Sequence, residues 1–137
     1  MKKDLVIENK IEQVALLASF VEEICEELGL GPDLVFNLNL VLEEAVTNVV
    51  MYAYPEGEVH QIWLSAEEHN GSLVFTLQDE GAEFDPTVVP EADVTLSAEE
   101  REIGGLGIFL IRQIMNEVSY QRIDGRNVLT MKKNTVD

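Results

Sequence analysis

The sequence predicts an α+β fold, a two-layer sandwich in which a mixed, mainly antiparallel sheet of about five strands is covered on one face by three helices. Two observations predict this class. Segments with apolar residues at every second position are grouped into hairpins, whereas three segments with helical spacing are segregated from them along the chain. The 137 residues contain no internal repeat and no linker, so we expect a single domain covering residues 1–137.

The N-terminal part predicts one strand and one helix. The stretch DLVIE, residues 4–8, is typical of a short strand. From Ile11 to Leu28 apolar residues recur at spacings of three and four with glutamates between them, which indicates an amphipathic helix. Gly29 is the expected end of this helix.

A second helix is predicted from about residue 33 to residue 53. Pro32 suits its first turn, and Pro55 lies just beyond its expected end. At about 100° per residue, one side of this helix forms an apolar stripe that should face the sheet. The stripe consists of Leu34, Leu38, Val41, Ala45 and Val49.

Two hairpins complete the sheet. Apolar residues alternate on both sides of Asn70-Gly71, and Asp124-Gly125 separates two further alternating runs; such dipeptides are the strongest short signal for a hairpin turn. A third helix is predicted after the glycines that precede Ile108.

A long acidic segment lies between the first hairpin and the third helix. Residues 81–103 are rich in acidic and small residues and include Pro86 and Pro90. Loops of this length inside a domain are usually functional, so we expect a lid over about residues 86–103, with an idle insertion as the alternative.

Composition excludes several classes of function. The formal charge is −17, from 26 acidic and 9 basic residues, and no Lys or Arg occurs between Lys10 and Arg101. Such a surface repels phosphate backbones and anionic membranes, so we expect neither direct nucleic-acid binding nor membrane binding. A bound nucleotide would need backbone N–H groups, a divalent cation and the arginines of the last third.

The compartment expected from the sequence is the cytoplasm. The single cysteine, Cys25, cannot form an internal disulfide and is interpreted as a small apolar filler of a helix. The N-terminus lacks the apolar run of a signal peptide, and no window reaches the roughly 18 apolar residues that indicate a membrane span.

The first candidate site residues are Glu44 and Asn48, one helical turn apart on the flank of the apolar stripe. A carboxylate at an apolar boundary needs a partner or a task, because burial disfavours its charged form. Asn48 offers an oxygen ligand suited to Mg²⁺, and Glu44 could act as a general base. The alternative is an ordinary surface contact between residues four apart.

Two further motifs follow. Asp79 comes at a strand end and can accept a proton from an exocyclic amino group such as that of adenine, while Gly81 permits a sharp turn or a close approach. The stretch GGLG, with Arg101 shortly before it, opens into a helix whose exposed N–H groups suit phosphate. An ordinary turn and a flexible loop, respectively, are the alternatives.

Taken together and in this order, the three motifs resemble one family. EEAVTN, the strand-end DEG and GGLG look like the N box and the two glycine boxes of the Bergerat-fold ATPases, the superfamily of gyrase and the histidine kinases. The resemblance spans roughly residues 34–132, and the small size and the EEAVTN wording are most similar to the anti-sigma factor serine kinases.

The resemblance implies a role for each motif. Glu44 is expected to be the catalytic base, Asn48 to hold Mg²⁺ and contact the nucleotide, and Asp79 with Gly81 to read the adenine of ATP or ADP. The other nucleotide contacts that it implies are Phe84, Arg101, Gly104, Gly105, Leu106, Gly107 and Thr130.

The implied activity is that of an ATP-dependent protein serine kinase. It would phosphorylate an anti-anti-sigma protein of the STAS type on serine and sequester a sigma factor, with residues 4–28 helping to form a homodimer or a partner surface. The DEGxxFDP form is similar to a stress-response branch of these kinases. Alternatives are a nucleotide-gated switch without chemistry and a scaffold that no longer binds nucleotide.

Two positions depart from the family pattern. Tyr52 stands where many relatives carry His or another polar residue, and an aromatic side chain can still support the helix end. Glu83 replaces the second glycine of the first glycine box, so a carboxylate is expected near the nucleotide. This replacement is the feature that favours the scaffold alternative.

Overall fold

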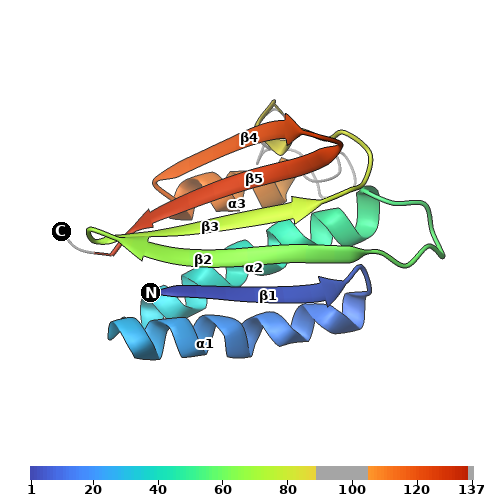
Figure 1. Ribbon diagram of the computed structural model, residues 1–137. Coiled ribbons are helices and arrows are strands. Elements are labelled where there is room, and N and C mark those ends of the chain that lie inside the picture. Colours follow the sequence, from blue (N-terminus) through green and yellow to red (C-terminus); the bar gives the residue numbers. More distant parts are fainter. Residues whose placement is uncertain (89–104, 136–137) are drawn as a thin grey trace.

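The computed structural model describes residues 1–88 and 105–135 of the chain (Figure 1). The strands are β1 (Lys2–Glu8), β2 (Gln61–His69), β3 (Ser72–Asp79), β4 (Glu117–Ile123) and β5 (Arg126–Asn134). The helices are α1 (Leu16–Leu28), α2 (Pro32–Tyr52) and α3 (Gly105–Ile114), and two short 3-10 helices are η1 (Ile11–Ala15) and η2 (Pro86–Val88).

The strands form one sheet in the order β1-β2-β3-β5-β4, and the helices cover one of its faces (Figure 1). The predicted α+β sandwich is therefore confirmed. All four pairs of neighbouring strands are antiparallel, so the sheet is not mixed as expected. The reason is that β3 and β4, which run in the same direction, are separated by β5 and do not pair.

Both predicted hairpin turns are confirmed. Asn70 and Gly71 have φ values of 51° and 81°, and Asp124 and Gly125 have values of 48° and 77°. Two successive residues with positive φ give the turn whose twist matches that of the flanking strands. The first turn sets the register of β2 on β3, and the second sets that of β4 on β5.

The boundary of the first helix differs from the prediction. The segment predicted as a single helix from Ile11 begins as η1, and α1 itself begins at Leu16. Its end is as expected, because Gly29 adopts a left-handed conformation with φ 70° and the N–H of Leu30 donates to Cys25 O at 2.8 Å.

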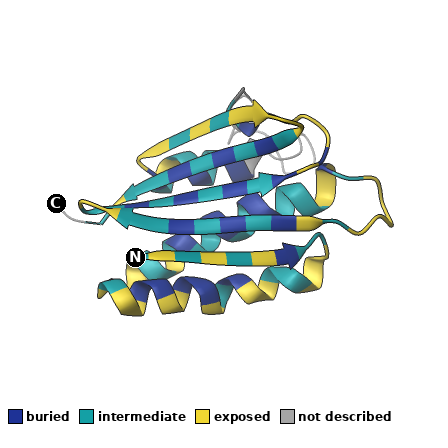
Figure 2. Ribbon diagram, viewed as in Figure 1, coloured by how far each residue is buried: buried dark blue, intermediate teal, exposed yellow. Residues whose placement is uncertain are grey.

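The core lies between the helices and the sheet, and buried residues alternate with more exposed ones along β2, β3 and β5 (Figure 2). On α2 the buried stripe is displaced from the predicted one, because Leu34 and Val49 are only half-buried. Its buried residues are Leu38, Val41, Leu42, Ala45 and Val46. The displacement arises because α2 packs against α1 on one side and α3 on the other, as well as against the sheet.

Helix α2 is also long and apolar enough to cross a membrane by length and composition alone, with 21 residues and a hydropathy of 1.4. No such segment was expected from the sequence. A helix that packs in the core of a globular protein passes the same test. The buried stripe of α2 lies in the hydrophobic core together with Phe75 and Leu77 of β3.

Truncation of Leu38 to alanine should destabilise the protein by about 2–5 kcal/mol, because Leu38 is fully buried and the change leaves a cavity. Phe36 lies on the same helix with 69% of its surface exposed, so Phe36→Ala should stay within about 0.5 kcal/mol of the wild type. Urea unfolding of both variants measures the difference. Equal losses would contradict the packing of α2 described above.

Candidate functional site

A cavity opens where the end of β3 and the start of β5 meet the C-terminal half of α2. It contains about 480 Å³ of empty space, part of which is open solvent. Its walls are mostly apolar, with a few polar groups among them. The residues that line it are Ala45, Asn48, Val49, Ala53, Leu77, Asp79, Phe84, Pro86, Ile111, Tyr120, Asn127 and Leu129.

The flank of α2 brings Glu44 and Asn48 against the beginning of α3. A Cβ atom added to Gly107 would stand 2.8 Å from Glu44 Oε2 and 3.6 Å from Asn48 Nδ2. Gly107 is buried, and both α2 side chains are half-buried. The lack of a side chain at Gly107 therefore lets the α3 backbone reach a carboxylate and an amide. Two of the sequence motifs form one site.

Asp79 lines the cavity at the end of β3, and Gly81 follows it two residues later. Asp79 is only 3% exposed, and its Oδ1 accepts the N–H of Gly81 at 2.9 Å. A Cβ atom added to Gly81 would stand 2.4 Å from Ala53 O, and the next N–H, from Ala82, donates to that same carbonyl at 2.9 Å. The end of β3 is thus fixed to the end of α2 by a contact that only glycine permits.

Asn127 is a site residue that the sequence analysis missed. It is 6% exposed and stands opposite Asp79 in the register of β3 and β5. Its Nδ2 donates to Asp79 Oδ1 at 2.9 Å and to Ala82 O at 2.8 Å. No motif around Asn127 signals this role, because its partner on β3 is 48 residues away in the sequence.

The oxygen of the Asn127 side chain accepts from three further groups. The N–H of Phe84 donates at 3.2 Å, the hydroxyl of Tyr120 at 2.5 Å and Nη1 of Arg122 at 3.1 Å. Burial raises the pKa of Tyr120, and the negative charge of Glu83 raises it further. The Tyr120 hydroxyl therefore keeps its proton and can donate to Asn127.

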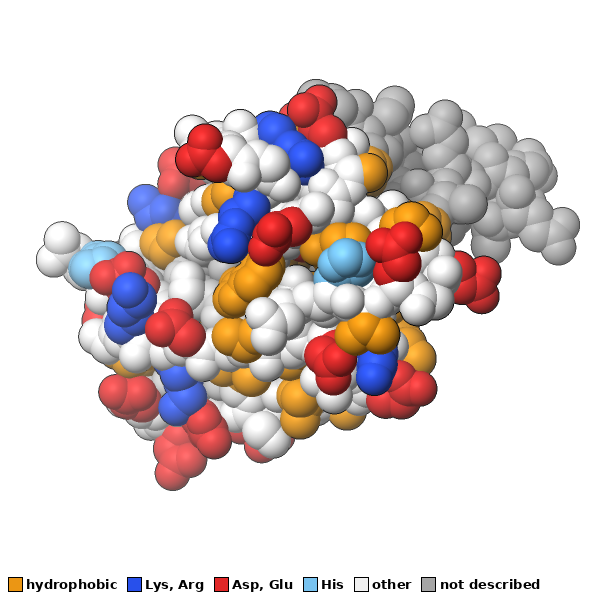
Figure 3. All heavy atoms as spheres, turned by 45° about the vertical axis from the view of Figure 1, so that its right-hand side comes forward, with side chains coloured by type: hydrophobic (Ala, Val, Ile, Leu, Met, Phe, Trp, Pro, Cys, Tyr) orange, Lys and Arg blue, Asp and Glu red, His pale blue; other side chains and the backbone are white. Residues whose placement is uncertain are grey.

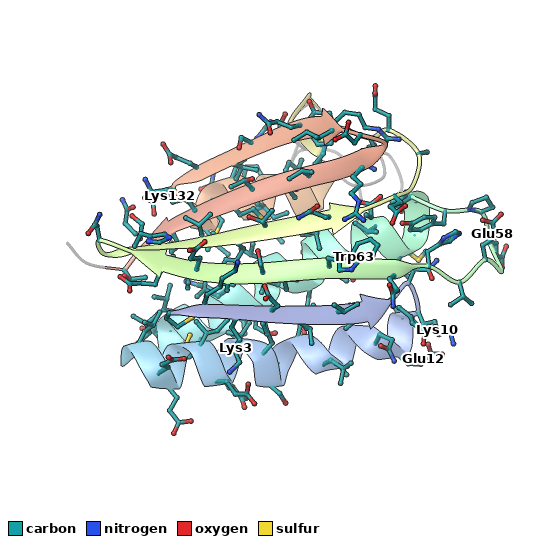
Figure 4. The ribbon with its side chains drawn as sticks, viewed as in Figure 1. Lys3, Lys10, Glu12, Glu58, Trp63 and Lys132 are labelled. Carbon is teal, nitrogen blue, oxygen red and sulfur yellow. The ribbon has the colours of Figure 1, made fainter. Side chains whose placement is uncertain are left out.

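A second tyrosine supports the strand end from outside the cavity. The hydroxyl of Tyr54 accepts the N–H of Glu80 at 2.7 Å, and its ring stacks on His60 with centroids 4.0 Å apart. Burial raises the pKa of Tyr54. Trp63 lies on the open face of the sheet (Figure 4). The Arg126 guanidinium stacks 4.5 Å from its ring centre and lies 3.4 Å from the Glu80 carboxylate.

The segment after β3 is anchored to α3. Asp85 Oδ1 accepts the N–H of Thr87 at 2.8 Å and its hydroxyl at 2.5 Å, and Arg112 donates to Thr87 O. The start of the expected lid, residues 86–88, thus forms η2 and is held on α3. The rest of the expected lid lies outside the described residues.

The structure brings to the site five of the residues that the sequence analysis singled out. Glu44, Asn48 and Gly107 adjoin one another, and Asp79 and Phe84 line the cavity. Gly105 and Leu106 begin α3, although the surroundings of these two residues are not described. Arg101 and Gly104 lie outside the described residues.

Thr130 is not brought to the cavity. On β5 the side chains of Asn127 and Leu129 face the cavity, and Thr130 follows Leu129, so it points to the opposite face of the sheet. The two departures from the family pattern, Tyr52 and Glu83, are also outside the lining, and both side chains are exposed.

On the described surface, several basic side chains lie beside acidic ones. On the face drawn in Figure 3, acidic and basic side chains are interspersed. Lys3, Lys10, Arg126 and Lys132 each lie within 4 Å of a glutamate carboxylate. These cations are therefore partly neutralised by the protein itself, and no continuous basic patch forms on the described part of that face.

Comparison with known proteins gives consistent results. A family model described as a histidine kinase-like ATPase domain matches residues 7–133. The serine/threonine-protein kinase BtrW of Bordetella bronchiseptica is 34% identical over 96 residues, which cover 70% of this chain and 68% of that protein. The serine-protein kinase RsbW of Bacillus cereus is 27% identical over 135 residues, covering 96% of this chain and 84% of that protein.

A solved structure shares the fold. The histidine kinase domain of the blue-light activated histidine kinase EL346 from Erythrobacter litoralis superposes with a TM-score of 0.54 at 15% sequence identity. The match covers 89% of this chain, and this chain spans 60% of the length of that structure. At this identity the likeness concerns the fold alone.

Replacement of Gly81 by alanine should destabilise the protein by about 1–3 kcal/mol, because the atoms that the new methyl group would meet belong mainly to the backbone of Ala53 and cannot turn aside. Gly31→Ala is the control, since Gly31 has a φ of −78° and nothing within 4 Å of an added Cβ atom. Thermal unfolding compares the two. A Gly81→Ala protein as stable as the control would contradict the close approach.

Proposed function

The chain belongs to the histidine kinase-like ATPase domain family, and from this premise we propose that it is an ATP-dependent protein serine kinase of the anti-sigma factor type. The observation that carries the proposal is the meeting of Glu44, Asn48 and Gly107 beside the cavity that contains Asp79. The kinase names of the relatives BtrW and RsbW support the reaction type.

The cavity would hold the adenine base of ATP, and the start of α3 beside it would hold the phosphates. Asp79 is a buried acceptor that can take a hydrogen bond from the adenine amino group, between apolar walls that include Leu77 and Ile111. The first N–H groups of α3 have no partner within the helix, and the helix dipole favours anions there. In a chain with a charge of −17, backbone N–H groups are a suitable source of phosphate contacts.

The donor set fits a magnesium ion that is shared with phosphates. Asn48 offers an amide oxygen and Glu44 a carboxylate beside it, whereas the described residues contain no group of three or more His, Cys, Asp or Glu side chains that could hold a metal. Mg²⁺ commonly uses few protein ligands together with substrate phosphates, so Asn48 is the proposed ligand. When bound, the ion would neutralise charge on the phosphates.

Glu44 is the proposed general base. It would accept the proton of a serine hydroxyl while the serine oxygen bonds to the γ-phosphorus and the bond from that phosphorus to the β–γ bridging oxygen breaks, which releases ADP. Gly107 keeps the α3 backbone close to Glu44 Oε2. The proposed base therefore lies next to the start of α3, where the phosphates would bind.

The proposed partners follow from the resemblance to the anti-sigma factor serine kinases. A STAS-type anti-anti-sigma protein would carry the serine, a sigma factor would be sequestered, and the protein would work in the cytoplasm as a homodimer. One domain with a lid over about residues 86–103 is part of this proposal. The Glu83 side chain does not itself line the cavity, although its negative charge acts on Tyr120, which does.

Glu44→Gln should abolish phosphoryl transfer to a serine-bearing partner, by about 10²–10⁴-fold, while leaving nucleotide binding nearly intact, because the amide cannot accept the proton. Glu43→Gln is the control, since Glu43 is next to Glu44 on α2, whereas the side chains nearest to Gly107 are those of Glu44 and Asn48. Transfer of radioactive phosphate from ATP to the partner provides the measurement. Undiminished transfer by Glu44→Gln would remove Glu44 from the role of base.

Asn48→Ala should remove the magnesium-dependent part of nucleotide binding. With a nucleotide at about a hundred times its dissociation constant, the wild type should gain roughly 2.7 kcal/mol and several degrees in melting temperature. Thermal unfolding with ADP or ATP, with and without Mg²⁺, measures this gain. Asn37→Ala on the same helix should behave as the wild type, and a wild type that no nucleotide stabilises would refute the proposed function.

A further inference from the structure

We propose that the exposed outer side of α2 is the docking surface for the protein that accepts the phosphoryl group, and that this protein presents an apolar surface with neutral or basic flanks around its serine. The inference rests on the proposed function, because it takes Glu44 as the general base. It adds to that function the surface that binds the second substrate and the side chains that determine its affinity.

A second, largely apolar stripe runs along α2 on the side away from the core. Four residues at spacings of four, seven and four lie within about 60° of one another around the helix axis, roughly opposite the buried Leu38. This outer stripe consists of Phe36, Leu40, Thr47 and Met51. At its two ends, 69% of the surface of Phe36 and 58% of that of Met51 are exposed.

The outer stripe makes α2 unusual among helices that cover a sheet. Such a helix normally carries polar and charged residues on the side that faces water. Helix α2 has apolar residues on both sides, and only 28% of the residues in its most apolar 18-residue window are buried. Contiguous apolar side chains on a protein surface mark contact sites, whereas single ones need no explanation. The outer side of α2 therefore has the character of a protein contact surface.

The position of Glu44 indicates which protein covers this surface. Glu44 borders the outer stripe, one turn after Leu40, and along the helix axis it is about 12 Å from Phe36 and about 10 Å from Met51. The serine hydroxyl has to come within about 3 Å of the base. A standard interface covers about 800 Å² of each partner, which is a disc of roughly 16 Å radius. An acceptor with its serine near the centre of such an interface therefore reaches both ends of the outer stripe.

The charges of α2 restrict the chemistry of this partner. Every charged residue of α2 is acidic, and Asp33 in its first turn is exposed. Like charges that face each other across an interface are unfavourable, so carboxylates beside the serine would oppose docking. A symmetric pair of this chain would set the acidic side chains of the two α2 helices against each other. An apolar surface with neutral or basic flanks is the complementary partner.

The test uses Phe36→Ala and Met51→Ala, made singly and together. Both side chains are exposed, so neither substitution should unfold the protein. Steady-state transfer of phosphate from ATP to purified STAS-type proteins of the same genome measures kcat and the KM for the acceptor. We expect each substitution to raise this KM by about fivefold or more, because it removes a contact with the acceptor. The value of kcat and the dissociation constant of ADP with Mg²⁺ should stay unchanged.

The control is Val6→Ala, which should leave the KM unchanged. Val6 is also apolar and 50% exposed, but it stands in register with Trp63 on the open face of the sheet. An unchanged KM in the double variant, or an equal loss of ADP binding, would overturn the inference. A changed oligomeric state of the double variant in analytical ultracentrifugation would overturn it too, since the outer stripe would then join two copies. A wild type that phosphorylates none of these proteins would instead refute the proposed function.

Discussion

The site depends on how closely other backbone segments approach α2. Gly81 lies where a single added carbon would stand 2.4 Å from Ala53 O, and Gly107 lies where it would stand 2.8 Å from Glu44 Oε2. Because α2 also packs on the sheet, these two contacts place the end of β3 and the start of α3 relative to the core. That packing determines the shape of the cavity between them.

A buried polar network fixes the other side of the cavity. The Asn127 amide donates two hydrogen bonds and accepts three. These bonds connect β5 to the end of β3, to the segment that follows β3, and to β4. A buried network with all members paired gives rigidity, whereas a partly paired one is costly. The cavity is therefore bounded by close backbone packing on the α2 side, and on the sheet side by the Asn127 amide, whose nitrogen and oxygen are both fully hydrogen-bonded.

The acidic composition is compatible with the proposed nucleotide site because the attraction for phosphate need not come from side chains. Among the described cations, several already lie beside glutamates. The N-terminus of α3 and a magnesium ion at Asn48 would provide local positive charge without changing the overall sign.

The sequence by itself determined the elements, both hairpin turns and three motifs, because periodicity, Asn-Gly and Asp-Gly turns and short-range spacing are local properties. It also determined that Glu44 and Asn48 share one flank of a helix. Only the tertiary structure decided which strands pair with each other and in which register. The register of β3 on β5 places Asn127 opposite Asp79, and the alternation along β5 turns Thr130 away from the cavity. A contact between residues far apart in the chain depends on the packing of the whole sheet, and local sequence does not encode it.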